Sequence, residues 1–367
     1  MAKPLHFLTA GSDGRKLDAG ILREATATLS SEEDRRIASH IVEELEMHGR
    51  LPFVWTPQED NFIKLHPQER WLPYLIYRYK FKRYPLERKV ADFPIYLLIE
   101  PTSVCNLRCT MCFQVDPTFT HSREYMGMMD MGLYRNVIDQ AQEGGTQAIT
   151  LASRGEPTLH KHFGEMLAYA SGKFFDLKVN TNATKLTERL SHDILSSDVN
   201  ELVFSVDAND KDLYEKIRVR GRFEEVLENI VRFRDIREKQ YPGSRLSTRI
   251  CGVKFKPEQD EDAFKKFWSP ICDHVAYGDL EARWDTYNND QHPTLTHSCG
   301  YLWERMYVWY DGKVNPCDVD YKSLLSVGNV KDNSIAALWH SPAYDSLRKA
   351  HLEGRRSAYL PCDRCGV

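Results

Sequence analysis

Apolar residues change their spacing twice along the 367-residue chain. Residues 1–92 read mainly as helical and irregular segments. Ser30–Asp34 places serines before three acids, which is typical of a helix start, and the helical repeat of 36–47 stops near Gly49. From about 93 to 285, short apolar runs alternate with helix-length stretches, and beyond 285 the chain is rich in loops.

The middle zone predicts repeated strand–helix units. Its clearest helices are Tyr134–Glu143 and Phe223–Lys239. The expected strands are Tyr96–Glu100, Ala148–Ala152, Leu177–Asn180, Leu202–Asp207, Thr248–Phe255 and His274–Leu280. Repeated β–α units imply a parallel sheet. Six units are too few for a closed eight-stranded barrel, so the sequence predicts an α/β fold with an open, partial barrel.

Composition narrows the class of protein. Hydrophobic residues make up 42% of the chain and charged residues 28%, as in ordinary globular proteins, and a net charge of −4 gives no case for nucleic-acid binding. No apolar run reaches about 18 residues, so no membrane span is expected. The first residues lack a signal-peptide layout, so we expect a cytoplasmic protein. Nine cysteines in a reducing compartment then point to metal binding or catalysis.

Three of these cysteines, Cys105, Cys109 and Cys112, follow the first predicted strand within eight residues. Three thiolates can hold three corners of an iron–sulfur cube and leave one iron open, whereas a cluster that only carries electrons normally has four cysteine ligands. A zinc site or chance core cysteines remain alternatives. The position at the carboxyl end of a strand favours a functional site, because α/β sites gather at that edge.

The spacing C-x3-C-x2-C resembles the signature of the radical S-adenosylmethionine (SAM) superfamily. The resemblance implies that the open iron chelates SAM, and that reductive cleavage yields a 5′-deoxyadenosyl radical that takes a hydrogen atom from substrate. It also implies an electron donor of the flavodoxin or ferredoxin type. The family often has an aromatic residue before the third cysteine; here Met111 stands there and Phe113 follows Cys112, and we expect both near the adenine.

Later strand ends are similar to the family's SAM-binding landmarks. Ser153–Pro157 resembles the Gly-Gly-Glu motif, with Arg154 in place of the first glycine, and implies that Gly155 and Glu156 meet the SAM ammonium. The remaining landmarks follow on the next strands and are expected to meet the ribose or carboxylate of SAM: Asn182, Ser205 and Arg218.

The C-terminal zone holds four further cysteines: Cys299, Cys317, Cys362 and Cys365. The stretch 309–317 predicts a hairpin around Asp311-Gly312. Four thiolates complete the ligand set of a cluster, and equally of a structural zinc site. Residues 328–339 are similar to the auxiliary-cluster extensions of radical SAM enzymes, called SPASM in their seven-cysteine form and twitch in their shorter form. The resemblance implies a second [4Fe–4S] cluster and three domains, 1–92, 93–285 and 286–367.

Cys251 and Cys272 are left over, and a free cysteine is usually a small core residue. Cys251 shares one strand face with Arg249 and Val253, because side chains alternate along a strand. If that face lines the barrel, the Cys251 thiol points at substrate.

Residues 70–89 mix aromatic and basic side chains with few acids. This pattern is compatible with a helix that packs on the barrel, or with contact to a phosphate-bearing or lipid-linked substrate. The sequence leaves both open.

Twitch-type relatives include sugar-type dehydrogenases, so the resemblance favours a radical SAM oxidoreductase that oxidises a sugar- or cyclitol-like alcohol. The alternatives are epimerisation, with Cys251 as hydrogen-atom donor, and peptide or protein modification. Peptide-modifying relatives often begin with a strand–strand–strand–helix domain, and the helical pattern of 1–92 differs from it. A simple electron carrier would leave the SAM landmarks unexplained.

Overall fold

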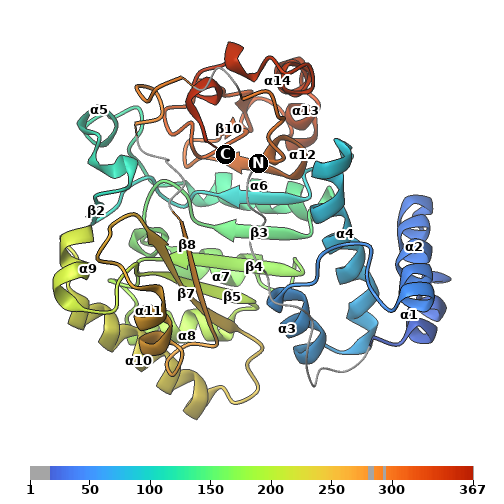
Figure 1. Ribbon diagram of the computed structural model, residues 1–367, viewed down its shortest axis with the longest axis horizontal. Coiled ribbons are helices and arrows are strands. Elements are labelled where there is room, and N and C mark those ends of the chain that lie inside the picture. The colour runs from blue at the N-terminus through green and yellow to red at the C-terminus, as the bar shows by residue number, and fades with distance from the viewer. Residues whose placement is uncertain (1–16, 280–284, 292–294, 367) are drawn as a thin grey trace. The chain divides into compact units, whose positions relative to one another are not determined.

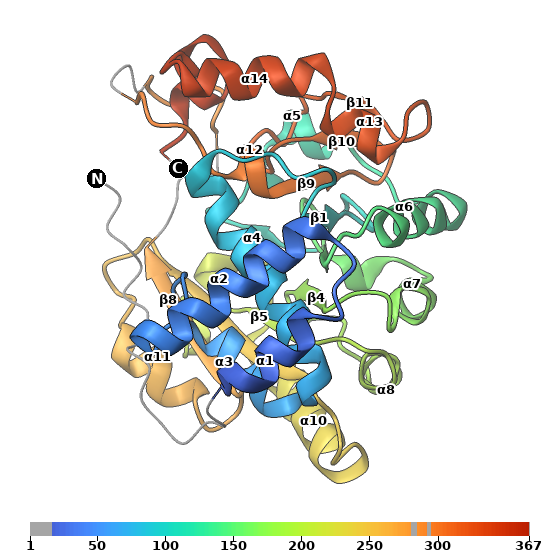
Figure 2. The same ribbon diagram turned by 90° about the vertical axis from the view of Figure 1, so that its right-hand side faces the viewer.

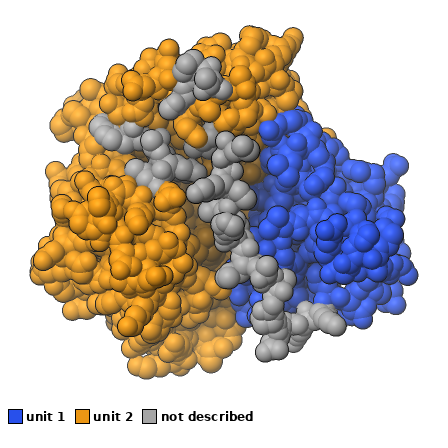
Figure 3. All heavy atoms as spheres, in the orientation of Figure 1, with its two compact units in different colours: residues 1–90 blue, residues 91–367 orange. Residues whose placement is uncertain are grey.

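The computed structural model describes residues 17–279, 285–291 and 295–366 (Figure 1). The chain divides into two compact units, residues 1–90 and 91–367 (Figure 3). Among the described residues, no helix has the length and apolar character needed to cross a bilayer.

All regular elements in the described part of unit 1 are helices or helical turns. Its elements are α1 (Ala19–Thr26), α2 (Glu32–His48), α3 (Pro57–Leu65), the 3-10 turn η1 (Gln68–Arg70) and α4 (Trp71–Glu87). The predicted helix start is confirmed: the Ser31 hydroxyl accepts a hydrogen bond of 3.2 Å from the Asp34 N–H, and Gly49 ends α2 in the left-handed region at φ 64°.

The basic residues of α4 have acidic partners within unit 1. Arg78 Nε lies 2.5 Å and Lys82 Nζ 2.6 Å from Oε1 of Glu59, whose side chain is fully buried. Lys80 Nζ lies 2.6 Å from a carboxylate oxygen of Asp34. A cation already paired in this way has less to offer a phosphate, so the pairing weakens the case for phosphate contact at residues 70–89.

Unit 2 contains the predicted partial barrel. Its six parallel strands follow one another in chain order across the sheet. They are β1 (Tyr96–Ile99), β3 (Ala148–Leu151), β4 (Asp176–Thr181), β5 (Glu201–Ser205), β7 (Ser247–Lys254) and β8 (His274–Asp279). The six-unit open barrel is therefore confirmed; position 280, included in the last predicted strand, lies outside the described residues.

Helices follow the strands and cover the outer face of the sheet. They include α6 (Met131–Glu143), α7 (Phe163–Ala170), α8 (Glu188–Ser196), α10 (Phe223–Gln240) and α11 (Glu261–Trp268), with the short α5 (Pro117–Thr120) and α9 (Lys211–Ile217) in loops. Figure 2 shows α6, α7 and α8 in a row along one side. The two predicted helices correspond to α6 and α10, each extended by a turn or less.

Side chains along each strand alternate between the two faces of the sheet, and most of those on the inner face are polar or charged. Phe204 packs on Phe233 of α10 on the outer side, and a side chain at Gly252 would meet Phe264 of α11. Residues of opposite parity therefore line the inner face. From β4, β5 and β7 they are Lys178, Asn180, Glu201, Val203, Ser205, Arg249, Cys251 and Val253.

The C-terminal segment extends the same sheet. β9 (Arg305–Val308) pairs in parallel with β1, and β10 (Lys313–Asn315) and β11 (Gly328–Asn329) follow antiparallel. The predicted hairpin at Asp311-Gly312 is confirmed, with Gly312 at φ 87°. α12 (Tyr301–Glu304), α13 (Ile335–Trp339) and α14 (Pro342–Leu352) complete the segment. One sheet therefore contains strands from before and after residue 285, and the three-domain division stays a prediction.

Candidate active site

The three-cysteine loop lies at the carboxyl end of β1 and is fixed by backbone hydrogen bonds. Its short strand β2 (Arg108–Cys109) pairs antiparallel with β6 (Arg218–Val219). The Thr110 N–H donates to the Ile217 carbonyl at 3.0 Å, and the Cys112 N–H donates to the Cys109 carbonyl at 2.9 Å. These bonds hold the loop against the segment that follows α9.

The three cysteines of this loop are shielded from solvent to different degrees: Cys109 is buried, and Cys105 and Cys112 are half-buried. Burial raises the pKa of Cys105 and of Cys112 to about 12 each, and raises that of Cys109 above its usual value. Thiols with such pKa values stay protonated at neutral pH unless a cation compensates the thiolate charge. Three thiols in one fixed loop fit an iron–sulfur cluster with one iron left for another ligand.

Gly155 allows the next loop to approach the cysteine loop. A Cβ atom at this position would lie 2.3 Å from the Thr102 carbonyl oxygen and 2.5 Å from that of Val104. The following N–H, of Glu156, donates to the Val104 carbonyl at 2.9 Å. Only glycine fits here, so the match to the family motif has a steric reason at this position.

The Glu156 carboxylate is buried beside Cys105 and anchored to the end of β4. Oε1 accepts hydrogen bonds of 2.6 Å from the hydroxyls of Thr158 and Thr181, and Oε2 accepts one of 2.6 Å from the Asn182 N–H. Burial outweighs these bonds and raises the pKa of the carboxyl group. A cation such as the SAM ammonium would stabilise the ionised form.

We expect Glu156→Gln to weaken SAM binding about ten- to a hundredfold, because a hydrogen bond to a charged partner contributes roughly 1.5–3 kcal/mol. Equilibrium binding of SAM to anaerobically reconstituted protein measures this, with iron content as the check on folding. The control is Glu165→Gln, whose side chain is 61% exposed. Equal SAM affinity in Glu156→Gln and wild type would remove Glu156 from the pocket.

Asn182 joins the end of β4 to the cysteine loop. Its Nδ2 lies 3.1 Å from Asn106 Oδ1 and 4.0 Å from the Cys105 sulfur, while its Oδ1 accepts hydrogen bonds from Thr184. The next residue, Ala183, has φ 60°, which gives the sharp turn after the strand. Asn182 therefore lies beside Cys105, and its contact with SAM stays a prediction.

Ser205 ends β5 and pairs in register with Cys251 of β7, so these two side chains are neighbours on the inner face. Arg218 lies at β6, and its guanidinium has two partners within the protein. It forms an ion pair of 2.6 Å with Asp207 and donates to the Cys109 sulfur at 3.6 Å. The sequence does not single out Asp207, which the structure places at this site with φ 68°.

The two residues expected near adenine have different surroundings. Met111 is half-buried. The Phe113 ring is buried and stacks on Tyr321, with ring centroids 4.7 Å apart, and it meets Phe119 edge-on. Phe113 thus ties the cysteine loop to the segment after Cys317.

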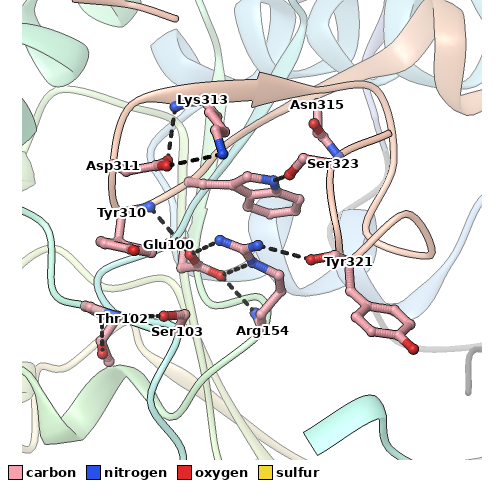
Figure 4. Close-up of polar contacts among 12 residues, drawn as sticks. Glu100, Thr102, Ser103, Arg154, Tyr310, Asp311, Lys313, Asn315, Tyr321 and Ser323 are labelled. Atoms are coloured by element: carbon pink, nitrogen blue, oxygen red, sulfur yellow. Dashed lines mark hydrogen bonds and ion pairs between the residues drawn. The ribbon is translucent and has the colours of Figure 1, made fainter. Parts of the chain in front are cut away.

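Arg154, where the family motif has glycine, forms a buried junction with the C-terminal segment (Figure 4). Its Nε and Nη2 each lie 2.7 Å from a carboxylate oxygen of Glu100, and its Nη1 donates to the Tyr321 carbonyl at 2.9 Å. The guanidinium lies 4.3 Å from the ring centroid of Trp309, and the Tyr310 N–H donates to Glu100. Two features of the sequence could have indicated this ion pair: an arginine inside a glycine motif, and an acidic residue at the end of a predicted strand.

One cavity is lined by all four C-terminal cysteines: Cys299, Cys317, Cys362 and Cys365. Burial raises the pKa of Cys299 to about 11 and that of Cys362 to about 12, and raises that of Cys317 well above its usual value. Four thiols around one cavity fit the ligand set of a second cluster.

Backbone contacts fix this second set of thiols. The Cys299 N–H donates to His351 Nδ1 of α14 at 3.2 Å, and the Val319 N–H donates to the Cys317 sulfur at 3.3 Å. Arg356 donates to the carbonyls of Cys362 and Cys365 at 3.1 and 3.0 Å. The Cys362–Cys365 pair is thus held against the 3-10 turn η4 (Arg356–Ala358), which follows α14.

Two family profiles match the chain. That of the radical SAM superfamily matches residues 99–267, and that of SPASM, an iron–sulfur cluster-binding domain, matches residues 299–366.

Known proteins resemble parts of the chain. The tungsten-containing aldehyde ferredoxin oxidoreductase cofactor-modifying protein of Pyrococcus furiosus is 34% identical over 113 residues, 30% of this chain and 30% of its own. Matches to mycofactocin maturase MftC likewise cover about a third of that relative. The subtilosin biosynthesis protein AlbA of Bacillus subtilis is 23% identical over 74% of this chain and 65% of its own.

A solved structure shows the same fold. Streptococcus suis SuiB bound to precursor peptide SuiA superposes with a TM-score of 0.57 at 17% identity, covering 86% of this chain and 80% of that one. This superposition shows a shared fold, and the two family profiles identify residues 99–267 as a radical SAM superfamily region and residues 299–366 as a SPASM iron–sulfur domain.

Proposed function

We propose that this radical SAM enzyme oxidises a carbinol carbon of a sugar- or cyclitol-like metabolite. Cys105, Cys109 and Cys112 would hold the cluster that, once reduced by a flavodoxin- or ferredoxin-type donor, supplies the electron for SAM cleavage. Gly155, Glu156, Asn182, Ser205 and Met111 would surround SAM. Cys299, Cys317, Cys362 and Cys365 would hold one auxiliary [4Fe–4S] cluster. Oxidation of the carbinol gives a hydrogen atom to the 5′-deoxyadenosyl radical, a proton to a base or to solvent, and an electron that this cluster would accept.

The observation that carries the proposal is the polar inner face of the sheet. Glu201 lies between two cations: Lys178 Nζ is 3.2 Å from its Oε2, and Arg249 Nε is 3.0 Å from its Oε1. All three side chains keep 14–30% of their surface exposed although they lie inside a strand layer. Their remaining N–H groups and carboxylate lone pairs would bond to substrate hydroxyl groups.

Asn180 adds an acceptor to the same face. Its Oδ1 is buried and has no hydrogen-bond partner in the part of the chain that the structure describes. The register places Asn180 beside Val203, and Val203 beside Arg249, so acceptor and guanidinium belong to one layer. Buried polar atoms normally have partners, and a substrate hydroxyl would supply one.

Two other outcomes compete with oxidation. Cys251 lies on the inner face next to Ser205, which suits a hydrogen-atom donor in an epimerase. A peptide substrate is the other candidate, in view of the subtilosin biosynthesis relative. Against it, residues 17–90 form helices and no strand, unlike the strand-rich peptide-binding domain of many such enzymes.

The test uses full-length reconstituted protein, SAM and a panel of cyclitols, aminocyclitols and sugar alcohols deuterated at the carbinol carbon. We expect deuterium to move into 5′-deoxyadenosine and one product to lack two hydrogens. In deuterated water, wild type and Cys251→Ala should give the same unlabelled product. Solvent deuterium in the product, lost in Cys251→Ala, would establish the epimerase instead. Label transfer from peptides alone would overturn the proposal.

A further inference from the structure

Arg218 is held in one orientation by two partners on opposite sides. Its Nε and Nη2 lie 2.7 and 2.6 Å from Oδ2 of Asp207, and its Nη1 lies 3.6 Å from the Cys109 sulfur. The side chain is 12% exposed and that of Asp207 is 2% exposed. Strand pairing of β2 with β6 puts Cys109 and Arg218 directly opposite each other.

Asp207 is itself fixed, so Arg218 cannot easily swing toward another ligand. Asp207 Oδ1 accepts a hydrogen bond of 2.9 Å from the Val253 N–H, and its carbonyl accepts one of 2.9 Å from Gln259 Nε2. The ion pair joins Nε and Nη2 of Arg218 to one oxygen of Asp207, Oδ2, and leaves N–H groups of Nη1 and Nη2 for other acceptors. The SAM-binding role that the family resemblance implies for Arg218 stays a prediction, and the contact of its Nη1 with the Cys109 sulfur does not depend on that role.

We infer that Arg218, oriented by Asp207, is a positioning residue that sets the reduction potential of the cluster held by Cys109. A [4Fe–4S] cluster with three thiolates carries one more negative charge when it is reduced. A buried guanidinium that donates to a ligating sulfur stabilises that reduced form, because hydrogen bonds to sulfur and local charge tune the potential. This inference rests on Cys109 as an iron ligand, and is independent of the substrate.

Substitutions of Arg218 and of Asp207 should shift the reduction potential of this cluster in opposite directions. Arg218→Gln removes the positive charge and should move the potential of this cluster to a more negative value. Asp207→Asn keeps the Oδ1 acceptor for Val253 and the shape of the side chain, but removes the counter-charge. The arginine then acts on the sulfur uncompensated, so the potential should become more positive. Arg218→Lys keeps the charge and should restore much of the wild-type value.

The experiment is an anaerobic potentiometric titration of the full-length protein without SAM, followed by electron paramagnetic resonance of the reduced cluster. The signal is assigned as the one lost when Cys105, Cys109 and Cys112 are replaced together. Lys216→Gln is the control, because it removes a charge from a neighbouring side chain that is 61% exposed and screened by solvent.

Opposite shifts for Arg218→Gln and Asp207→Asn, with none for Lys216→Gln, would support the inference. Unchanged potentials in both variants at full iron content would overturn it, as would a loss of SAM affinity alone in Arg218→Gln. If Arg218→Gln fails to hold the cluster, the isosteric Asp207→Asn is the deciding variant. A more positive potential in Asp207→Asn supports the inference, and an unchanged or more negative potential contradicts it. A signal that survives the triple cysteine replacement would show instead that the ligand assignment is wrong.

Discussion

Replacing Cys105, Cys109 and Cys112 together by alanine should remove about four of eight irons from the reconstituted protein and abolish SAM cleavage. The three thiols occupy one loop that is fixed to β6 and shielded from solvent, so they act as a single ligand set. Iron content and the formation of 5′-deoxyadenosine measure the two effects. An iron content equal to that of wild type would contradict the assignment.

Cys317→Ala is the matched control for this variant. It acts on the cavity lined by the C-terminal cysteines, so it should reduce the iron content but leave reductive SAM cleavage in place. Net oxidation of substrate should stop, because the electron acceptor is lost. Zinc in that cavity, with no iron lost on replacement, would leave the proposed oxidation without its acceptor.

Arg154→Met should lower the free energy of unfolding by about 3–5 kcal/mol, because it leaves the Glu100 carboxylate buried without its counter-charge. The two side chains are 2% and 0% exposed, so water cannot replace the guanidinium. The double variant Glu100→Gln/Arg154→Met should recover part of the loss, since no unpaired charge remains. Urea unfolding of the anaerobically reconstituted proteins measures both.

The control for this prediction is an ion pair on the surface of the same unit. Lys211 and Glu224 are 2.9 Å apart and each 55% exposed, so Lys211→Met should leave the free energy of unfolding nearly unchanged. A loss below about 1 kcal/mol for Arg154→Met would mean that Trp309 and Tyr321 hold the junction without the ion pair.

Much of the barrel could be predicted from the sequence because its signals are local. Each predicted strand of the six overlaps an observed one, since apolar runs and the helices between them depend on neighbouring residues. The parallel pairing of β9 with β1 could not be predicted in this way. It joins residues near 97 and 306, and nothing in a four-residue apolar run specifies such a distant partner.

In the candidate site too, local motifs could be predicted from the sequence, whereas contacts between distant residues could not. The cysteines, Gly155 and Glu156 could be found because motif spacing is a property of the chain itself. The partners of Arg154 and Arg218 could not, because Glu100 and Asp207 reach them only after strand ends have come together. The stacking of Phe113 on Tyr321 could not be predicted either, because Tyr321 belongs to a distant segment of the chain.

The pairing of β1 with β9 also has a consequence for biosynthesis. Roughly 200 residues separate the two strands, so one edge of β1 has no partner while most of the barrel is being translated. At about 5–20 residues per second, that edge stays open for roughly 10–40 s on the ribosome. An unpaired strand edge invites association with other chains. Nascent chains stalled before residue 305 should therefore be the species most in need of chaperone protection.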